Sequence, residues 1–321
     1  MGRSVSITNN LNLQQSHTTR IIAIVVFFLV GISLGIYSPM KQPPAAKPEV
    51  TEIEIIYNLN PPLTIEQQKE MVFVEGGTFL MGSNEGGKNE RPVHQVTVNS
   101  FLIGKYEITD ELSEIVGKYN PGPIFNDSVP LGAYKISNDI AGTFDFCNKM
   151  SKMEGLNPAY KIIKKRVDRD SSSDVIFIEW EVICDFNSNG YRLPTEAEWE
   201  FAARGGKKSK GYKYSGSNNI DEVAVYLNGG SSQIGVGTKK PNELGIYDMS
   251  GRQNEMCWDF LGDYIPANQT NPRGPDSGNA RVIRGGSWMD TREVCTVTNR
   301  SADSPNRMYY WPIGLRLVRT K

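Results

Sequence analysis

The sequence predicts an α+β fold, in which short helices and strands are joined by many loops, behind an N-terminal transmembrane segment. Three observations support this fold class. The chain of 321 residues contains 31 glycines, and its hydrophobic fraction is only 39%, a composition typical of a globular protein rich in turns. Its apolar residues recur mainly in short alternating runs. One long uncharged stretch near the N-terminus is the exception.

The uncharged stretch at residues 21–37, IIAIVVFFLVGISLGIY, predicts a membrane anchor. A helix that rises about 1.5 Å per residue spans roughly 25 Å over this length, against a hydrocarbon core of about 30 Å. A cleaved signal peptide and a buried core helix are the alternatives, but no clear small-residue cleavage site follows. We therefore expect a tail at 1–20, an anchor at 21–37, a proline-rich linker at 38–67 and a folded domain at 68–321.

The folded domain opens with runs that predict strands. The stretches MVFVEGGTFLMG (71–82) and HQVTVNSFLIGKYEIT (94–109) alternate apolar and polar residues, and a polar loop joins them. Alternation of this kind indicates half-buried strands, here arranged as a hairpin-like start. Further along, AYKIIKKRV (159–167) and DVIFIEWEVI (174–183) predict a strand, a turn and a second strand.

Residues 139–154 predict the first long helix. Phe144, Cys147 and Met150 fall on one apolar face, and Gly155 is placed to end the helix. Cys147 is therefore predicted to be a core thiol and not a reactive one.

The stretch LPTEAEWEFAARGG predicts the clearest helix in the chain. Thr195 and Glu198 have the spacing of a capping box, and the pair Gly205 and Gly206 supplies the stop.

Charge and histidine content exclude two classes of function. The net charge is −1 and no long run of one sign occurs, so the sequence predicts no binding to nucleic acid. Histidine occurs only at His17 and His94. A metal site built from two or three imidazoles therefore cannot form in the folded domain.

One stretch fits the spacing of a calcium-binding EF-hand loop. The matching residues are Asp185, Asn187, Asn189, Gly190 and Glu196. An EF-hand needs a helix before its loop, whereas a strand is predicted here, and the Thr195 cap assigns Glu196 to the first turn of the next helix. We therefore expect a turn rich in Asp and Asn at this position, without calcium.

Five stretches occur in an order that resembles the formylglycine-generating enzyme family, whose domain is also called the sulfatase-modifying factor domain. They are FVEGGTFLMGS, GYRLPTEAEWEFAARGG, KKPNELGIYDMSG, CWDF and the C-terminal set RVIRGGSW, C, NR and IGLRLVR. The resemblance covers about residues 68–320. It implies a loop-rich fold of the C-type-lectin-like class. Because members are commonly exported, it also implies a single-pass protein of the cytoplasmic membrane with its C-terminal domain outside.

The resemblance implies a specific catalytic site, from which this sequence departs. Active members oxidise a sulfatase cysteine to formylglycine, using copper held by two cysteine thiolates spaced five residues apart near the C-terminus. The first of these positions matches Cys295, and we expect the second to fall on Arg300. Two soft thiolates select Cu(I). A single thiol beside a guanidinium predicts no copper site.

The resemblance also implies a structural calcium ion in SGRQNEMCWDF. Gly251 and Glu255 match the family pattern there, whereas Arg252, Asn254 and Met256 replace the usual asparagine and tryptophans. We therefore expect a weakened calcium site at Gly251 and Glu255.

Cys295 has three interpretations. It is catalytic if the domain is an oxidase. Because relatives with a Cys-Trp-Asp segment tend to carry a cysteine here too, the resemblance also allows a disulfide between Cys257 and Cys295, which an exported domain permits. The third interpretation is a recognition surface around it, since Tyr, Trp and Arg carry much binding energy. The expected ligand-binding residues are Asp290, Arg292, Asn306, Tyr309, Tyr310 and Trp311.

The sequence therefore predicts a membrane-anchored, exported domain that binds a protein or surface ligand, or serves as a scaffold in the cell envelope. Variable proteins of diversity-generating retroelements end in a similar way, which allows a C-terminally variable binder. The alternative is a copper-dependent oxidase that forms formylglycine.

Overall fold

The described part of the domain begins with a short helix, α1 (Ile65–Gln68). The computed structural model describes residues 64–117, 141–169, 176–230, 234–303 and 313–321. Thr64 caps α1 in a capping box with Gln67, and the buried Gln68 donates to Glu111 at 2.6 Å. The described structure thus starts inside the segment 38–67 that was expected to be linker.

The predicted anchor at 21–37 lies outside the described residues. Within the part of the chain that the structure describes, no helix is long and apolar enough to span a bilayer.

The two alternating runs at the start of the domain form four strands, divided between two sheets. One sheet has the order β1 (Met71–Val74), β4 (Phe101–Gly104), β13 (Val318–Thr320) and β7 (Tyr191–Arg192). The other has the order β2 (Gly77–Met81), β3 (His94–Val98) and β9 (Gln269–Thr270). Each predicted run is broken by a turn. At Gly76 a Cβ would lie 2.6 Å from the backbone of Asn99, so the two turns pack too closely for a side chain.

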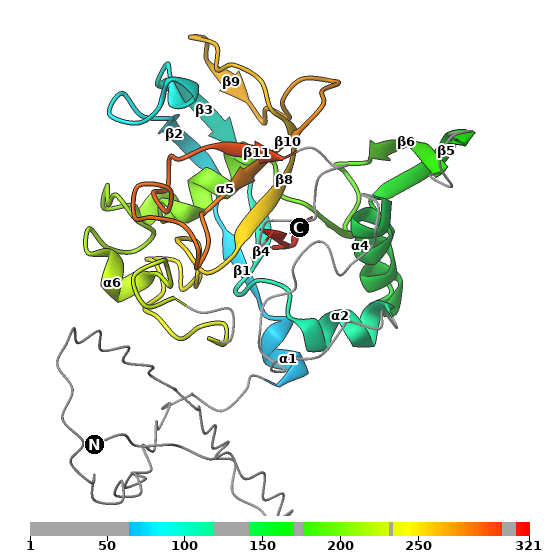
Figure 1. Cartoon of the computed structure of the whole chain (residues 1–321), viewed down its shortest axis with the longest axis horizontal. Coiled ribbons are helices and arrows are strands. Elements are labelled where there is room, and N and C mark those ends of the chain that lie inside the picture. Colours follow the sequence, from blue (N-terminus) through cyan, green and yellow to red (C-terminus); the bar gives the residue numbers. More distant parts are fainter. Residues whose placement is uncertain (1–63, 118–140, 170–175, 231–233, 304–312) are drawn as a thin grey trace, which may run out of the picture. The chain divides into compact units, whose positions relative to one another are not determined.

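A third sheet carries the C-terminal half of the fold. Its order is β11 (Ser301–Asp303), β10 (Arg281–Arg284), β8 (Asn254–Phe260) and β12 (Ile313–Gly314). β10 pairs antiparallel with β8 and with β11, whereas β12 runs parallel to β8. Figure 1 shows α5 (Glu196–Ala203) packed beside β8 and β10.

The helices confirm the sequence predictions at their ends. In α5, Thr195 and Glu198 form the predicted capping box, and Gly205 adopts a left-handed φ of 90° after the helix. α4 (Ala141–Met153) buries Phe144, Cys147 and Met150, and Gly155 follows it with φ 68°. The remaining helices are α2 (Asp110–Gly117), α6 (Ile220–Val223) and the 3-10 turns η1 (Lys88–Glu90) and η2 (Gly206–Lys208).

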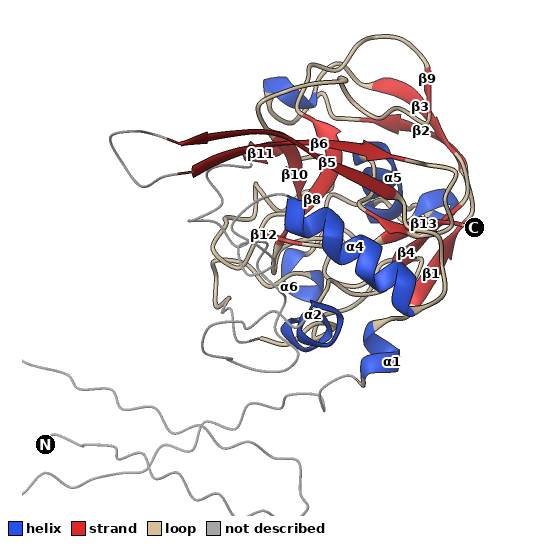
Figure 2. Ribbon diagram, turned by 90° about the vertical axis from the view of Figure 1, so that its right-hand side faces the viewer, coloured by secondary structure: helices blue, strands red, loops and turns tan. Residues whose placement is uncertain are grey.

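The predicted strand, turn and strand form a two-stranded ribbon of β5 (Tyr160–Arg169) and β6 (Ile176–Cys184). The pairing is antiparallel and shifts by one residue between Lys164 and Arg166. The ribbon extends away from the three sheets (Figure 1), and α4 lies beside it (Figure 2).

Three hydrophobic clusters form the core. The first joins α2 and α4 to β7 and the β8 face that carries Met256. The second packs β1–β4 against α5, with Trp199 and Phe201 at its centre. The third is small and contains Cys295 among residues 214–226. The site described next lies where the second and third clusters meet the C-terminal segment.

Candidate binding site

The segment from Gly285 to Asp303 links β10 to β11 and carries both Cys295 and Arg300. It starts at a turn in which Gly285 and Gly286 have φ values of 95° and 73°. A Cβ on Gly286 would lie 2.9 Å from the Sγ atom of Cys295. The turn therefore needs glycine on two grounds, its left-handed backbone and its close approach to the thiol.

Cys295 is a buried thiol. Its exposed fraction is 0%, and it packs with Tyr214, Ile220 and Tyr226. Burial raises the pKa of Cys295 to about 12, and the negative charges of Asp290 and Glu293 add to the effect. The side chain is therefore a neutral thiol at physiological pH, which is a poor nucleophile and a poor metal ligand.

Arg300 has a different set of neighbours. Its Nε and Nη2 atoms donate to the two carboxylate oxygens of Glu196 at 2.6 and 2.8 Å, and its Nη1 donates to the carbonyl of Asn89 at 2.6 Å. The guanidinium also lies over the ring of Tyr264, 3.8 Å from its centroid. The Arg300 side chain is thus bound to the start of α5. Arg300 is not among the charged groups that shift the pKa of Cys295, which are Asp290 and Glu293.

The residue five positions before Cys295 is Asp290, and its charge acts on the thiol. The Asp290 carboxylate accepts the Ser287 N–H at 2.9 Å, the Ser287 hydroxyl at 2.6 Å and the Asn254 amide at 3.2 Å. Arg300 is the residue five positions after Cys295. Neither position supplies a second thiolate, so the donor set does not fit a two-coordinate Cu(I) site.

The expected disulfide between Cys257 and Cys295 is not formed. Both residues are free, buried thiols. Cys257 lies on β8 in the second core cluster, which packs on α5, whereas Cys295 lies in the third. The two side chains are directed into different parts of the core, and each is buried there among apolar neighbours.

Glu255 belongs to a buried ion pair. Its Oε1 accepts the Arg316 Nη2 at 2.6 Å, and its Oε2 accepts the indole N–H of Trp199 at 2.6 Å. The Gly251 carbonyl accepts the Gln253 N–H at 2.9 Å. Within the described residues no group of three or more His, Cys, Asp or Glu side chains is placed to hold a metal. The Glu255 carboxylate is thus engaged by Arg316 and Trp199, and the calcium site expected at Gly251 and Glu255 stays a prediction.

The EF-hand-like stretch forms a turn stabilised by side chains. Asp185 accepts the N–H of Asn187 at 3.0 Å, and Asn189 accepts the N–H of Asn157 at 2.9 Å. Strand β6 precedes this turn, and the Glu196 carboxylate faces Arg300. These positions agree with the prediction of a turn rich in Asp and Asn.

The predicted recognition residues are only partly described. Arg292 is exposed and Asp290 is half-buried, whereas Asn306, Tyr309, Tyr310 and Trp311 lie outside the described residues. Two apolar side chains that the sequence did not predict for this surface are exposed, Leu227 with an exposed fraction of 60% and Met289 with 48%. The Leu227 N–H donates to the Asp290 carbonyl at 3.0 Å, so this contact joins two segments far apart in the sequence.

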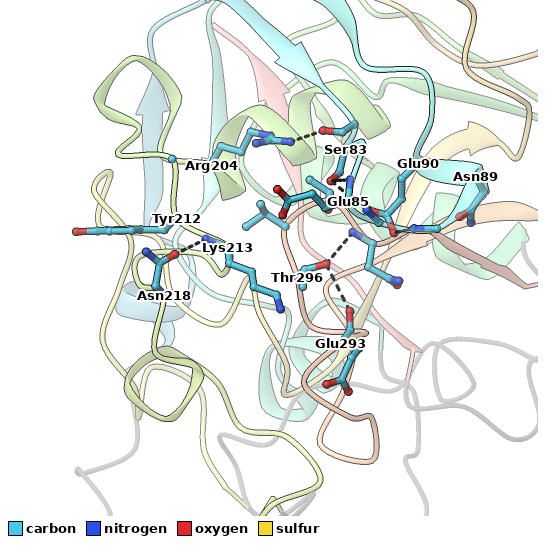
Figure 3. Close-up of a pocket in the computed structure, with 17 residues that line it drawn as sticks. Ser83, Glu85, Asn89, Glu90, Arg204, Tyr212, Lys213, Asn218, Glu293 and Thr296 are labelled. Atoms are coloured by element: carbon cyan, nitrogen blue, oxygen red, sulfur yellow. Dashed lines mark hydrogen bonds between the residues drawn. The ribbon is translucent and has the colours of Figure 1, made fainter.

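Two pockets flank the segment from Gly285 to Asp303. One, of about 390 Å³, is lined by polar Asn254, Asp290, Asn299 and Arg300 and by apolar residues such as Ile283 and Ile313. The other, of about 750 Å³, lies between the loop after β2, the 211–218 turn and residues 293–299 (Figure 3).

Most side chains that line the larger pocket are polar or charged, and Tyr212 and Val297 contribute apolar surface. In Figure 3 the Lys213 side chain extends toward Thr296 and Glu293. Sequence analysis missed these residues because the three segments meet only after folding, and no local pattern marks them.

Comparison with known proteins places these observations in a family. Residues 57–321 match the sulfatase-modifying factor enzyme 1-like domain. A relative from Paenibacillus barcinonensis, named chaperone protein LppX, is 35% identical over 271 residues, which cover 78% of this chain and 90% of LppX. A formylglycine-generating enzyme from Thermomonospora curvata is 28% identical over 288 residues, which cover 75% of this chain and 90% of the enzyme.

A solved structure has the same fold. Treponema denticola variable protein 1 superposes with a TM-score of 0.65 at 29% identity, and the match covers 78% of this chain and 95% of that protein.

Proposed function

The chain belongs to the sulfatase-modifying factor enzyme 1-like family, and from this premise we propose that its domain is a non-catalytic binding or scaffold protein. Family membership confirms the resemblance found in the five sequence stretches. The family contains enzymes, so the proposal depends on the site of this chain.

The lone buried thiol carries the proposal. Cys295 has a pKa raised to about 12 by burial, and the positions five residues away hold Asp290 and Arg300. Both of these side chains have other partners, Ser287 for Asp290 and Glu196 for Arg300. Oxidation of a substrate cysteine by copper bound between two thiolates would need a second cysteine beside Cys295, and neither of these positions supplies one.

The binding surface that we propose centres on the segment from Gly285 to Asp303. Arg292 and Met289 are exposed on it, and Leu227 lies beside it. An exposed mixture of apolar and charged side chains next to two pockets is suited to recognising a protein or surface ligand. The likeness to a variable protein of Treponema denticola supports this choice of surface.

We also propose that residues 21–37 anchor the chain in the cytoplasmic membrane and that the domain lies outside. Their uncharged composition and the proline-rich stretch that follows support this placement. The ligand would then be a component of the cell envelope or a molecule outside it.

The test of the non-catalytic assignment is an aldehyde assay. Purified protein supplied with copper, oxygen and a sulfatase-type cysteine peptide is expected to form no formylglycine, because one protonated thiol cannot hold Cu(I) between two sulfurs. An active formylglycine-generating enzyme assayed in parallel shows that the peptide and conditions are adequate. Aldehyde formed by the wild type and lost in Cys295→Ser would establish the oxidase instead.

The binding surface is tested in the same full-length chain by placing a photo-crosslinking amino acid at Met289 in the host cell. Discrete adducts are expected from Met289 and not from Ile115, which is exposed on α2. Equal labelling from the two positions would argue against a specific surface.

A further inference from the structure

The side chain of Arg252 is buried among acidic and carbonyl groups. Only 2% of it is exposed, and its Nη1 donates to the carbonyl of Gly235 at 2.6 Å. Its Nε lies 3.2 Å from the Oε2 atom of Glu107, a carboxylate with 0% exposure. A guanidinium in this position is a fixed positive charge inside the protein.

Two carboxylates, those of Glu107 and Asp248, act on this guanidinium. Asp248 accepts the Gly237 N–H at 2.6 Å through Oδ2. Its Oδ1 and the Oε1 of Glu107 are buried and accept no hydrogen bond from the described residues. Burial raises the pKa of Glu107 well above its usual value, and the charges of Arg252 and Arg316 only partly oppose that rise. Without a cation between them, two buried carboxylates would be costly to keep ionised.

The backbone is bent to bring these side chains inward. Asp248 and Arg252 have φ values of 60° and 67°, in the left-handed region that side chains other than glycine rarely adopt. They are two of three such non-glycine residues within the described part of the chain. A conformation with a cost in free energy persists where the surrounding contacts require it.

The structure assigns to Arg252 the role of an internal cation, which supplies beside Glu107 and Asp248 the positive charge that a divalent metal ion would otherwise supply. Arg252 also stands in the segment to which family resemblance assigns calcium, where the Glu255 carboxylate is already paired with Arg316. The guanidinium places a positive charge beside the carboxylates from within the chain, so we expect the domain to need no bound calcium here.

The internal cation also positions the candidate binding segment. The Arg252 carbonyl accepts the N–H of Trp288 at 3.0 Å, and the N–H of Gly251 donates to the carbonyl of Gly285 at 2.8 Å. The fixed backbone around Arg252 therefore holds the first turn of the segment from Gly285 to Asp303.

The experiment compares thermal unfolding of the wild type and Arg252→Met in EDTA and in millimolar CaCl₂. The wild-type Tm is expected to be the same in both. Arg252→Met leaves Glu107 with only the weaker influence of the Arg316 charge, which should lower Tm in EDTA by about 10 °C. Calcium should recover part of this loss, because Glu107, Asp248 and the Gly235 carbonyl then offer oxygen ligands.

Two further variants keep the test decisive if Arg252→Met folds poorly. Arg252→Lys retains the charge and should fold with a smaller loss in Tm and little response to calcium. In the double variant Glu107→Gln/Arg252→Met, removal of the carboxylate should raise Tm above that of Arg252→Met and abolish the calcium response. Arg292→Ala, at an exposed arginine, serves as the matched control and should leave Tm unchanged.

Three outcomes would overturn the assignment. A wild-type Tm that falls in EDTA would mean that the native domain depends on a metal. A calcium response that persists in Glu107→Gln/Arg252→Met would place the ion elsewhere. A double variant no more stable than Arg252→Met would show that Glu107 does not need the Arg252 charge.

Discussion

At the scale of single residues, Cys295 and Arg300 share one segment but point into different surroundings. Cys295 packs in the small cluster with Tyr214 and Tyr226, while Arg300 reaches Glu196 at the start of α5. Asp290, on the other side of Cys295, contributes its charge to the raised thiol pKa. Position 290 is therefore a better candidate than position 300 for a second thiol beside Cys295, and the sequence-based assignment to 300 stays a prediction.

This comparison of positions 290 and 300 gives a prediction about engineered copper binding. Asp290→Cys should bind Cu(I) at least about tenfold more tightly than the wild type, because the charge at position 290 acts on the Cys295 thiol and a cysteine there would supply a second thiolate. Arg300→Cys should bind as weakly as the wild type and should unfold more easily, since Glu196 loses its bidentate partner. Competition with a Cu(I) chelator and a thermal melt measure both effects. Tighter copper binding by Arg300→Cys than by Asp290→Cys would restore the original assignment.

At the scale of elements, local signals were predictable and long-range partners were not. The α5 cap, its glycine stop and the apolar face of α4 depend on residues within a turn or two of each other, so the sequence contains them. The parallel pairing of β12 with β8 and the Arg300–Glu196 ion pair, 104 residues apart, depend on the folded arrangement. Glu198 belongs to the local kind, because it caps α5 and its partner Arg192, at 2.7 Å, lies only six residues before it.

Glu198 provides a prediction about acid stability. Burial acts to raise its pKa, but the ion pair with Arg192 and the cap hydrogen bonds prevail and hold the pKa below the usual value. Its contribution is therefore present above the unfolded-state pKa of about 4.3 and is lost as the pH falls through the lower folded-state value. Glu198→Gln should lower the free energy of unfolding at pH 7 by about 3 kcal/mol.

Between about pH 5 and pH 3, the free energy of unfolding of Glu198→Gln should also fall less steeply than that of the wild type. Urea denaturation across this range measures both effects, with Glu66→Gln, on exposed α1, as the control. An identical pH slope in Glu198→Gln and the wild type would count against the ion pair as its source.

At the scale of the whole molecule, buried arginine–carboxylate pairs join distant parts of the chain. Arg316 links the C-terminus to Glu255 on β8 and to the Gly104 carbonyl at the end of β4. Arg284 on β10 pairs with Glu200 on α5. Since truncating one partner of such a pair leaves a buried charge, the described domain depends on its two halves folding together.

The predicted anchor gives a prediction for the complete chain. Full-length protein should fractionate with membranes, and protease added to intact spheroplasts should digest the domain, if residues 21–37 span the bilayer with the domain outside as we propose. Deletion of residues 1–37 should release the protein from the membrane fraction. A domain protected from protease while a periplasmic control is cut would reverse the proposed orientation.

The β5–β6 ribbon has a consequence for how copies of this protein behave in concentrated solution. Within the described residues no third strand pairs with either outer edge, so each edge presents open backbone groups on which strands of other molecules could add. Lys165 is the unpaired residue where the register shifts. A bulge of this kind twists the ladder and makes it a poor template for stacking. The irregularity in the ribbon is therefore a safeguard against self-assembly.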